Sequence, residues 1–186
     1  MPDFHALQTI ALEEIEVTLS GINPAQVGGL VTEIMCANQV FLVGVGRVNL
    51  SLLAFCKRLN HLGVKAYPVG AINEPRFNED DLLIVGSRSG KTIFPLSIAQ
   101  KAKEIGGKLA YIGSATQGFL PEKADIVVTF PAYGINTEDP RFKSTQIMTT
   151  LFEQSLLVFG DIVCKMILDG YHLDPVLVNR SHANLE

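Results

Sequence analysis

Residues 40–46 read VFLVGVG, a continuous apolar run that ends in a pair of glycines. The sequence LLIVG at residues 82–86 repeats this pattern. Apolar runs of this length without polar alternation are typical of strands buried on both faces of a parallel sheet. Three further short runs, at residues 66–69, 109–112 and 126–130, bring the expected strands to five. The sequence therefore predicts a parallel sheet of five short strands.

Helical patterns separate most of these strands. We expect helices at about residues 5–20, 24–36, 50–62, 92–105 and 144–168. The connection at 70–81 contains Pro75 and is too short for a full helix. Strands that alternate with helices indicate an α/β fold, here a doubly wound three-layer αβα sandwich around the sheet. The sequence shows no repeat or linker, so residues 1–186 are expected to form a single domain, with the N-terminal helices at about 5–36 packed on its core.

The composition excludes several classes of protein. The chain has 186 residues, of which 47% are hydrophobic and 18% charged, and its net charge is −4. This apolar fraction excludes a disordered chain. A mildly acidic composition without a basic block argues against a nucleic-acid partner. The sequence shows no signal-peptide pattern and no apolar run near the ~20 residues that span a bilayer, so we expect a cytoplasmic protein with no membrane partner.

The cysteines and histidines do not indicate a metal site. Cys36, Cys56 and Cys164 lie far apart and form no CxxC pair, and the chain has four histidines. Scattered residues of these types argue against a zinc site and against a disulfide framework. We expect the cysteines to be small core residues in a reduced protein, and we expect no metal.

The first glycine-ended strand leads into GVGRVN at residues 44–49. Ligands of doubly wound sheets bind beyond the carboxyl ends of the strands, where this loop is expected to lie. The loop begins like a dinucleotide fingerprint, but Asn49 stands at the third glycine position, and Gly70 and Ala71 follow the next strand where an acidic residue would be needed. A nicotinamide cofactor is therefore not expected. A plain tight turn remains an alternative for this loop.

The second loop reads GSRSGKT at residues 86–92, directly after a strand and at the start of a helix. Its ending is similar to a nucleotide P-loop, but only three residues separate its glycines, where that motif needs four. Ser87, Ser89 and Thr92 place three hydroxyls around a helix N-terminus, where free N–H groups favour an anion. Arg88 and a lysine add positive charge. A capped helix start needs only one hydroxyl, so we favour a phosphate site.

The expected helix at 144–168 combines an apolar face with a polar side. The apolar face comprises Ile147, Met148, Leu151, Phe152, Phe159, Ile162 and Met166. Gln146, Thr149, Thr150 and Glu153 follow one another at spacings that place them together on another side, where they could line a cleft. A solvated face explains this spacing more simply. Glu153 in a dry pocket could act as a general base, which the spacing alone does not establish.

The pattern Ser87-x-Ser89-Gly90-x-Thr92 after a strand, with Gly44-x-Gly46 after an earlier strand, resembles the sugar isomerase (SIS) domain, whose serine loop holds a sugar phosphate. More narrowly, the chain resembles the 6-phospho-3-hexuloisomerase family along nearly its whole length. The matching stretches are Gly46-Arg47, Arg58-Leu59-x-His61-Leu62-Gly63, Asp81-Leu82-Leu83-Ile84, Ala102-Lys103-x-x-Gly106, Ala124-Asp125, Leu151-Phe152-Glu153 and His182-Ala183-Asn184-Leu185-Glu186.

This resemblance implies an aldose–ketose isomerase that interconverts 3-hexulose 6-phosphate and fructose 6-phosphate through a cis-enediol, in the ribulose monophosphate pathway. It implies no metal or organic cofactor, and a homotetramer with sites near the subunit contacts. Glu153 would match the base that moves a proton between C1 and C2. His182, in a tail at 179–186 near the active site, would assist ring opening or proton transfer in a neighbour's site. The implied substrate- or phosphate-binding residues are Arg47, Asn49, Ser87, Arg88, Ser89 and Thr92.

The chain departs from the family pattern around the expected pocket. Val48-Asn49 replaces a usual Ser-Gly, and Arg88 and Lys91 change the charge of the serine loop. Residues 70–75 lack the usual Glu-Thr-Thr-Pro-like sequence. On the last helix, Ile147 and Thr149 replace a usual Pro and Gly. These changes make the binding of a phosphosugar a firmer expectation than the identity of the sugar.

Three alternatives are weighed against the hexulose phosphate isomerase. The first is an isomerase of another sugar phosphate. The second is a non-catalytic regulatory SIS protein, which would normally carry a DNA-binding module for which 186 residues leave no room, and which would not need Glu153 or His182. The third, a zinc-dependent isomerase, is disfavoured by the lack of clustered His and Cys.

Overall fold

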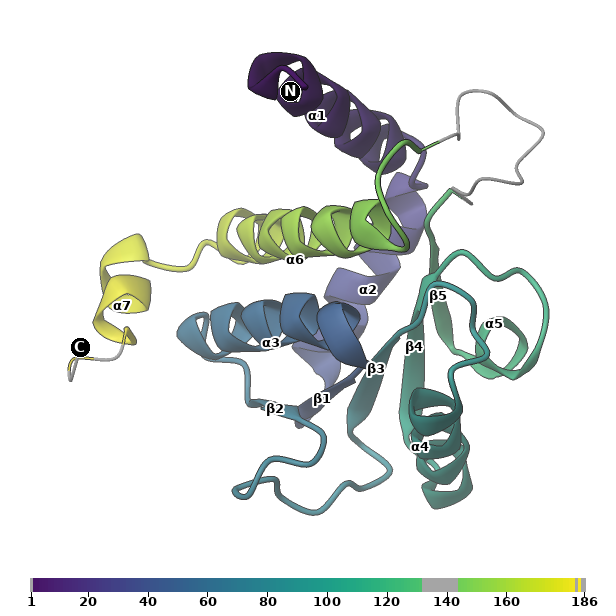
Figure 1. Ribbon diagram of the computed structural model, residues 1–186. Helices are drawn as coiled ribbons and strands as arrows, with labels where there is room; N and C mark the ends of the chain where they lie inside the picture. Colours follow the sequence, from purple (N-terminus) through teal and green to yellow (C-terminus); the bar gives the residue numbers. More distant parts are fainter. Residues whose placement is uncertain (1, 132–143, 183, 185–186) are drawn as a thin grey trace.

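Five parallel strands form the central sheet of the computed structural model, which describes residues 2–131, 144–182 and 184 (Figure 1). The strands are β1 (Val40–Val43), β2 (Ala66–Pro68), β3 (Leu82–Gly86), β4 (Lys108–Gly113) and β5 (Ile126–Thr129). Their order is β2-β1-β3-β4-β5, and each neighbouring pair is parallel. In β1, Val40 pairs with Ala66 on one side and with Leu82 on the other. The predicted five-stranded parallel sheet is confirmed.

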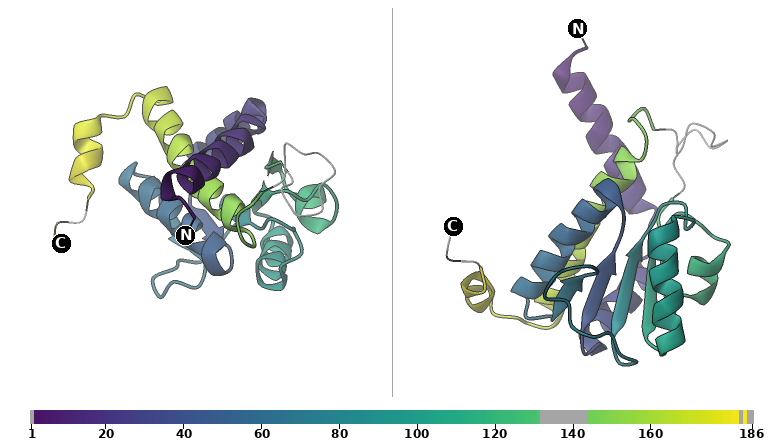
Figure 2. Two further views of the ribbon diagram at one scale, coloured as in Figure 1. Left: turned by 45° about the horizontal axis from the view of Figure 1, so that its top comes forward. Right: turned by 60° about the horizontal axis from the view of Figure 1, so that its bottom comes forward.

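Helices cover both faces of the sheet (Figures 1 and 2). The helices α2 (Pro24–Cys36), α3 (Gly46–His61) and α6 (Thr150–Gly170) lie on one face, and α4 (Ile93–Ile105) and α5 (Phe119–Lys123) on the other. Successive strand side chains point to opposite faces, so Leu42 and Ile84 pack with the first group, whereas Phe41 and Val85 pack with the second. The expected three-layer αβα sandwich is therefore confirmed.

The first helix, α1 (Phe4–Ser20), extends away from the sheet (Figure 2, right). Its buried residue is Thr18, near its C-terminal end, whereas Phe4, Leu7 and Leu12 are exposed. The packing of α1 is against α6. The apolar residues near its N-terminus therefore remain exposed in the described part of this chain.

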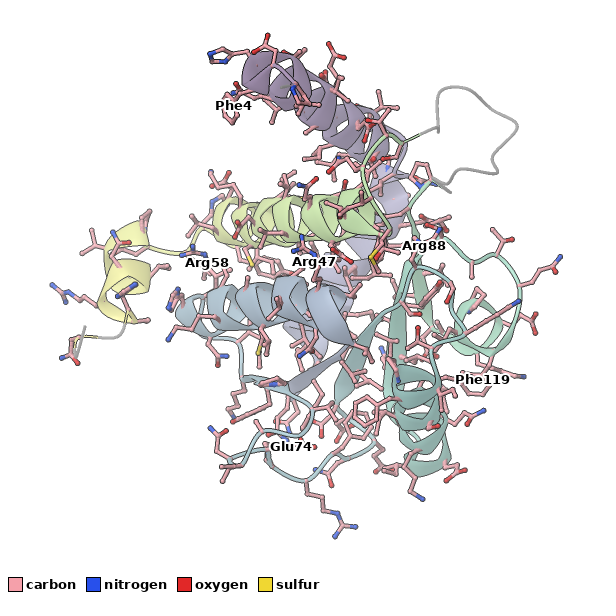
Figure 3. All side chains as sticks on the ribbon, in the orientation of Figure 1. Phe4, Arg47, Arg58, Glu74, Arg88 and Phe119 are labelled. Atoms are coloured by element: carbon pink, nitrogen blue, oxygen red, sulfur yellow. The ribbon has the colours of Figure 1, made fainter. Side chains whose placement is uncertain are left out.

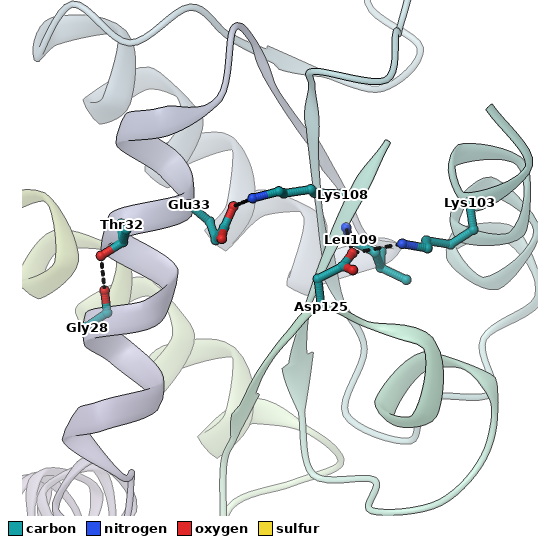
Figure 4. A network of polar contacts seen from close by, with 7 residues as sticks. All are labelled: Gly28, Thr32, Glu33, Lys103, Lys108, Leu109 and Asp125. Carbon is teal, nitrogen blue, oxygen red and sulfur yellow. Dashed lines mark hydrogen bonds and ion pairs between the residues drawn. The ribbon is translucent and has the colours of Figure 1, made fainter. Parts of the chain in front are cut away.

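Polar contacts join the layers at the edge of the sheet where the strands begin (Figure 4). The Lys108 ammonium at the start of β4 lies 2.5 Å from the carboxylate of Glu33 in α2. On the other side of the sheet, the carboxylate of Asp125 accepts hydrogen bonds from Lys103 Nζ in α4, at 2.9 Å, and from the Leu109 N–H, at 2.8 Å. These pairs tie helices to strands far from the glycine loops.

Two helix starts differ from the sequence prediction. Helix α3 begins at Gly46 rather than near residue 50, because a left-handed Gly46 (φ 59°) turns the chain directly from β1 into the helix. Helix α6 begins at Thr150 rather than near residue 144. Residues 144–149 are irregular, and Met148 has a φ of 54°, which an α-helix cannot contain.

The late start of α6 overturns part of the predicted apolar face. Ile147 and Met148 were expected on the apolar face of a helix, but they precede the helix and are exposed. The two short helices α5 and α7 (Pro175–Arg180) were not expected at all. Residues 70–81 contain no helix, as predicted. Within the described ranges, no helix combines the length and the apolar character needed to cross a membrane.

Candidate functional site

A pocket opens beside the carboxyl ends of β1 and β3, where the order of the strands reverses. At such a switch point the connections leave toward opposite faces of the sheet and open a crevice. The turn after β1 enters α3 on one face, and the serine loop after β3 enters α4 on the other. The pocket is lined by Val45, Gly46, Arg47, Val48, Gly86, Ser87, Arg88, Ser89, Thr92, Met148, Thr149 and Glu153.

Most of the predicted site residues meet in this pocket. Arg47, Glu153 and four residues of the serine loop line it together, although they come from three separate parts of the chain. Figure 3 shows Arg47 between α3 and α6, and Arg88 beside the start of α6. Asn49 and His182 are not among the lining residues. Asn49 is half-buried one turn into α3.

The serine loop presents hydroxyls at the start of α4. The hydroxyl oxygens of Ser87 and Thr92 lie 3.1 Å apart, and the Ser89 hydroxyl accepts a hydrogen bond from the Lys91 N–H at 3.3 Å. Thr92 is the N-cap residue of α4, but its side chain makes no capping bond. Since the first N–H groups of a helix have no partner within the helix, hydroxyls and N–H groups together form a setting suited to a phosphate.

A buried tyrosine in the neighbouring strand β4 holds the serine loop in place. The Tyr111 hydroxyl in β4 donates to the carbonyl oxygen of Ser87 at 2.8 Å and accepts from the Ala115 N–H at 3.2 Å. Burial raises the pKa of Tyr111, so its hydroxyl stays protonated as a donor. A Cβ at Gly113 would lie 2.1 Å from the Ser87 carbonyl oxygen, so only glycine fits there. Sequence reasoning missed both Tyr111 and Gly113.

Glu153 has a partner on each of its carboxylate oxygens. Its side chain is 8% exposed, and Oε2 accepts a hydrogen bond from Arg47 Nε. Its Oε1 accepts from the hydroxyl of Thr149 at 2.5 Å. The buried hydroxyl of Ser51 in α3 donates to the Glu153 carbonyl oxygen at 2.7 Å, which ties the first turn of α6 to α3. A buried carboxylate with fixed donors can exchange a proton with a ligand in a defined direction.

His182 lies far from this pocket in its own chain. Its ring centroid is 5.4 Å from that of His61, the last residue of α3, whereas Arg47 is the second residue of that helix. The 16 residues of α3 span about 24 Å. The tail was expected near the active site, but its described residues, 179–182 and 184, do not line this chain's own pocket. Residues 183, 185 and 186 of the expected tail lie outside the described residues.

Two of the three cysteines, Cys56 and Cys164, are buried as expected, whereas Cys36 at the C-terminal end of α2 is exposed and is not a core residue. Burial raises the pKa of the Cys56 thiol to about 11. Burial first, and then the charge of Asp161, raise the pKa of the Cys164 thiol to about 12, so neither forms a thiolate at neutral pH. Across the part of the chain that the structure describes, no group of three or more His, Cys, Asp or Glu side chains is placed to hold a metal ion.

Comparison with known proteins identifies the family. A doubly wound sheet with a hydroxyl-lined helix start opposite a buried carboxylate defines an α/β domain with a site suited to an anionic ligand. The chain belongs to the SIS domain family, whose sequence model matches residues 33–158. This confirms the resemblance that the serine loop indicated.

Individual relatives cover almost the entire chain. The 3-hexulose-6-phosphate isomerase of Bacillus subtilis (strain 168) is 33% identical over 175 residues, which are 94% of this chain and 95% of the relative. The 3-hexulose-6-phosphate isomerase of Methanocaldococcus jannaschii is 35% identical over 157 residues, which are 84% and 82% of the two chains. A crystal structure from Methanococcus jannaschii, from which a 3-hexulose-6-phosphate isomerase function was inferred, has a TM-score of 0.80 at 30% identity and covers 97% of this chain and 99% of that one.

Proposed function

We propose that this protein is a 3-hexulose-6-phosphate isomerase, which interconverts 3-hexulose 6-phosphate and fructose 6-phosphate in the ribulose monophosphate pathway. The observation that carries the proposal is the meeting of a buried carboxylate, Glu153, with the hydroxyls of the serine loop in one pocket. The relatives named 3-hexulose-6-phosphate isomerase, matched over most of the chain, support the same activity.

The proton transfer lies between C2 and C3 of the sugar. The carbonyl group is at C3 in 3-hexulose 6-phosphate and at C2 in fructose 6-phosphate, so the C1–C2 transfer expected from an aldose–ketose pair is wrong for these two ketoses. Glu153 removes the proton from C2, the C2=C3 double bond forms, and the C3 carbonyl oxygen takes up a proton. Return of the proton from Glu153 to C3 and loss of the O2 proton leave the carbonyl at C2. As C2 is oxidised, C3 is reduced, and no redox partner is needed.

The remaining residues bind and orient the substrate. Ser87, Ser89 and Thr92 hold the phosphate at the start of α4, and Arg88 adds positive charge there. Arg47 donates its Nε–H to the Glu153 carboxylate. The remaining N–H groups of its guanidinium stabilise the enediolate oxygen as negative charge develops. A fixed phosphate handle and one positioned base supply what an enediol mechanism requires, without a metal or an organic cofactor.

The test is turnover of 3-hexulose 6-phosphate to fructose 6-phosphate in the presence of EDTA. We expect wild-type turnover and its loss in Glu153→Gln, which keeps the shape of the side chain but cannot accept the proton. Fructose 6-phosphate should still raise the melting temperature of the variant, because the serine loop is intact. Equal rates for variant and wild type would contradict the role of Glu153, and inhibition by EDTA would contradict the metal-free mechanism.

An isomerase of another sugar phosphate is the second candidate. A neighbouring pocket shares Arg88, Met148 and Thr149 with the first, and it is also lined by Ser114 and Gln146. This adjoining space offers polar groups to a sugar that extends beyond the first pocket. Turnover of a pentose or other hexose phosphate, without turnover of 3-hexulose 6-phosphate, would favour this candidate. Binding without any turnover would instead favour a non-catalytic regulatory protein.

We further propose that residues 1–186 act as a single domain within a cytoplasmic homotetramer. The exposed apolar residues of α1, among them Phe4 and Leu7, and of α6, such as Ile162 and Met166, favour contacts between copies of the chain. The distance of His182 from its own pocket is compatible with its proposed role in a neighbour's site. Light scattering should give four copies. Mixing inactive Glu153→Gln and His182→Ala chains should restore part of the activity if sites are shared, whereas a monomer would contradict this proposal.

A further inference from the structure

A carboxylate of α1 holds the irregular segment 144–149 that precedes α6. Glu14 accepts hydrogen bonds from the Ser144 hydroxyl at 2.7 Å, the Thr145 N–H at 2.8 Å, the Thr145 hydroxyl at 3.1 Å and Gln146 Nε2 at 3.1 Å. Burial raises the pKa of Glu14, but these four donors outweigh it and hold the pKa below its usual value of 4.5. Glu14 is therefore an ionised anchor at neutral pH.

The anchored segment then passes through an unfavourable backbone conformation. Met148 has a φ of 54°, in the left-handed region that a residue with a Cβ rarely adopts. Met148 as a whole is 94% exposed, so packing of its side chain does not compensate for the backbone. Such a conformation persists when the flanking structure imposes it. Here the Glu14 anchor lies on one side and the first turn of α6 on the other.

The next residue, Thr149, uses its hydroxyl in an unusual way. It occupies the N-cap position of α6, where a threonine hydroxyl normally accepts a hydrogen bond from a backbone N–H of the first turn. This hydroxyl makes no capping bond and instead donates to Glu153 Oε1 at 2.5 Å. Since Arg47 contacts the other oxygen, the two donors together determine the plane of the carboxylate.

We propose that Thr149 is a positioning residue for Glu153 and that Glu14 acts through the segment 144–149 to keep Thr149 in place. The inference deepens the proposed function and rests on it, because it concerns the base of that reaction. Proton transfer at C2 and C3 needs the lone pair of one carboxylate oxygen to point at the sugar. Without the Thr149 hydroxyl, the carboxylate can rotate about its terminal bond toward the guanidinium of Arg47 and away from the substrate.

The first test compares Thr149→Val with Thr149→Ser. Valine preserves the shape of threonine without the hydroxyl, and serine preserves the hydroxyl without the methyl group. We expect Thr149→Val to lower kcat by about 10- to 100-fold with a small change in KM, and Thr149→Ser to restore most of it. Wild-type kcat in Thr149→Val, or equal loss in both variants, would overturn the role of the hydroxyl.

The second test compares Glu14→Gln with Glu13→Gln, its exposed neighbour on the same helix. Glutamine at position 14 keeps the size of the side chain but cannot accept all four hydrogen bonds. We expect Glu14→Gln to lower kcat and Glu13→Gln to leave it unchanged. The double variant Glu14→Gln/Thr149→Val should be no slower than Thr149→Val alone, because both changes affect one contact. Multiplied losses, or unchanged kcat in Glu14→Gln, would overturn the role of Glu14.

A spectroscopic readout keeps this inference separate from the proposed function. The carboxyl 13C resonance of Glu153 in labelled protein, identified by its loss in Glu153→Gln, should shift in Thr149→Val and in Glu14→Gln, and return to the wild-type position in Thr149→Ser. Inactivity of the wild-type protein on 3-hexulose 6-phosphate would overturn the proposed function alone. A resonance that does not move in Thr149→Val would overturn the positioning by Thr149, whatever the substrate.

Discussion

The two sides of the pocket are held in place in different ways. The serine loop lies directly after β3, and the neighbouring strand β4 supports it through the buried Tyr111 hydroxyl and the close approach of Gly113. The segment 144–149 follows no strand, and it depends on side-chain contacts with Glu14 from a helix more than a hundred residues earlier. The proposed phosphate side of the site is thus supported by the sheet, whereas the segment beside the proposed base Glu153 depends on α1.

The comparison shows where the site is sensitive to change. Substitutions at the residues of β4 that support the serine loop should change the backbone of that loop and so weaken phosphate binding strongly. Substitutions around Glu14 should alter the orientation of a side chain and so affect turnover, with smaller effects on stability. The following experiments test this difference, in order of decreasing expected effect.

Gly113→Ala should have the largest effect, because the added Cβ would lie 2.1 Å from the Ser87 carbonyl oxygen and 2.2 Å from the Tyr111 hydroxyl. The serine loop must move to accommodate it, so we expect kcat/KM to fall by at least about 100-fold and the melting temperature to fall clearly. Gly28→Ala in α2 is the matched control, because a Cβ there meets nothing within 4 Å. If Gly113→Ala kept wild-type kinetics, β4 would not support the loop as described.

The double variant Ser87→Ala/Ser89→Ala should weaken sugar-phosphate binding by about 10- to 100-fold, or about 1.4–2.8 kcal/mol in total, which is the contribution of about one hydrogen bond to a charged group. Isothermal titration with fructose 6-phosphate measures the loss. Ser97→Ala, on an exposed position further along α4, is the control and should bind normally. Unchanged affinity in the double variant would place the phosphate elsewhere.

Tyr111→Phe should have an intermediate effect. It removes the donor to the Ser87 carbonyl and the acceptor for the Ala115 N–H, so we expect a loss of about 1–3 kcal/mol in the free energy of unfolding. KM should rise more than kcat falls, because the change acts on the phosphate side. Tyr67→Phe on the edge strand β2 serves as the comparison in urea denaturation. A fall in kcat alone would mean that the two sides of the pocket are not separate.

The pH dependence of stability should show the smallest effect. The folded-state pKa of Glu14 lies below its usual value of 4.5, so Glu14 stabilises the fold above that pH and loses this contribution as pH falls through the folded-state pKa. The difference in melting temperature between wild type and Glu14→Gln should therefore be constant near neutral pH and shrink below about pH 4.5. A difference that stays constant in acid would show that the four donors do not depend on the Glu14 charge.

The sequence was a good guide to one side of the pocket and a poor guide to the other. The hydroxyls of Ser87, Ser89 and Thr92 lie within six residues of one another directly after a strand, so local pattern alone predicted that they face one site. The segment before α6 misled the prediction. The apolar residues Ile147 and Met148 continue the helical spacing, but the left-handed Met148 excludes them from the helix. Helical periodicity in the sequence cannot reveal this backbone conformation, because the conformation depends on contacts with α1.

The five strands with their parallel arrangement, the longer helices and the serine loop were determined by the sequence itself, through short apolar runs, helical periodicity and glycines that local pattern can identify. The order of the strands in the sheet and the short helices α5 and α7 were not predicted. Tertiary structure alone decided that Arg47 and Thr149 both contact Glu153, that Tyr111 supports the serine loop, and that His182 lies beside His61 instead of in its own pocket. Each of these contacts, apart from that between Thr149 and Glu153, joins residues far apart in the chain. Their formation depends on how α1, α3, α6 and the sheet pack, which no local pattern of residues specifies.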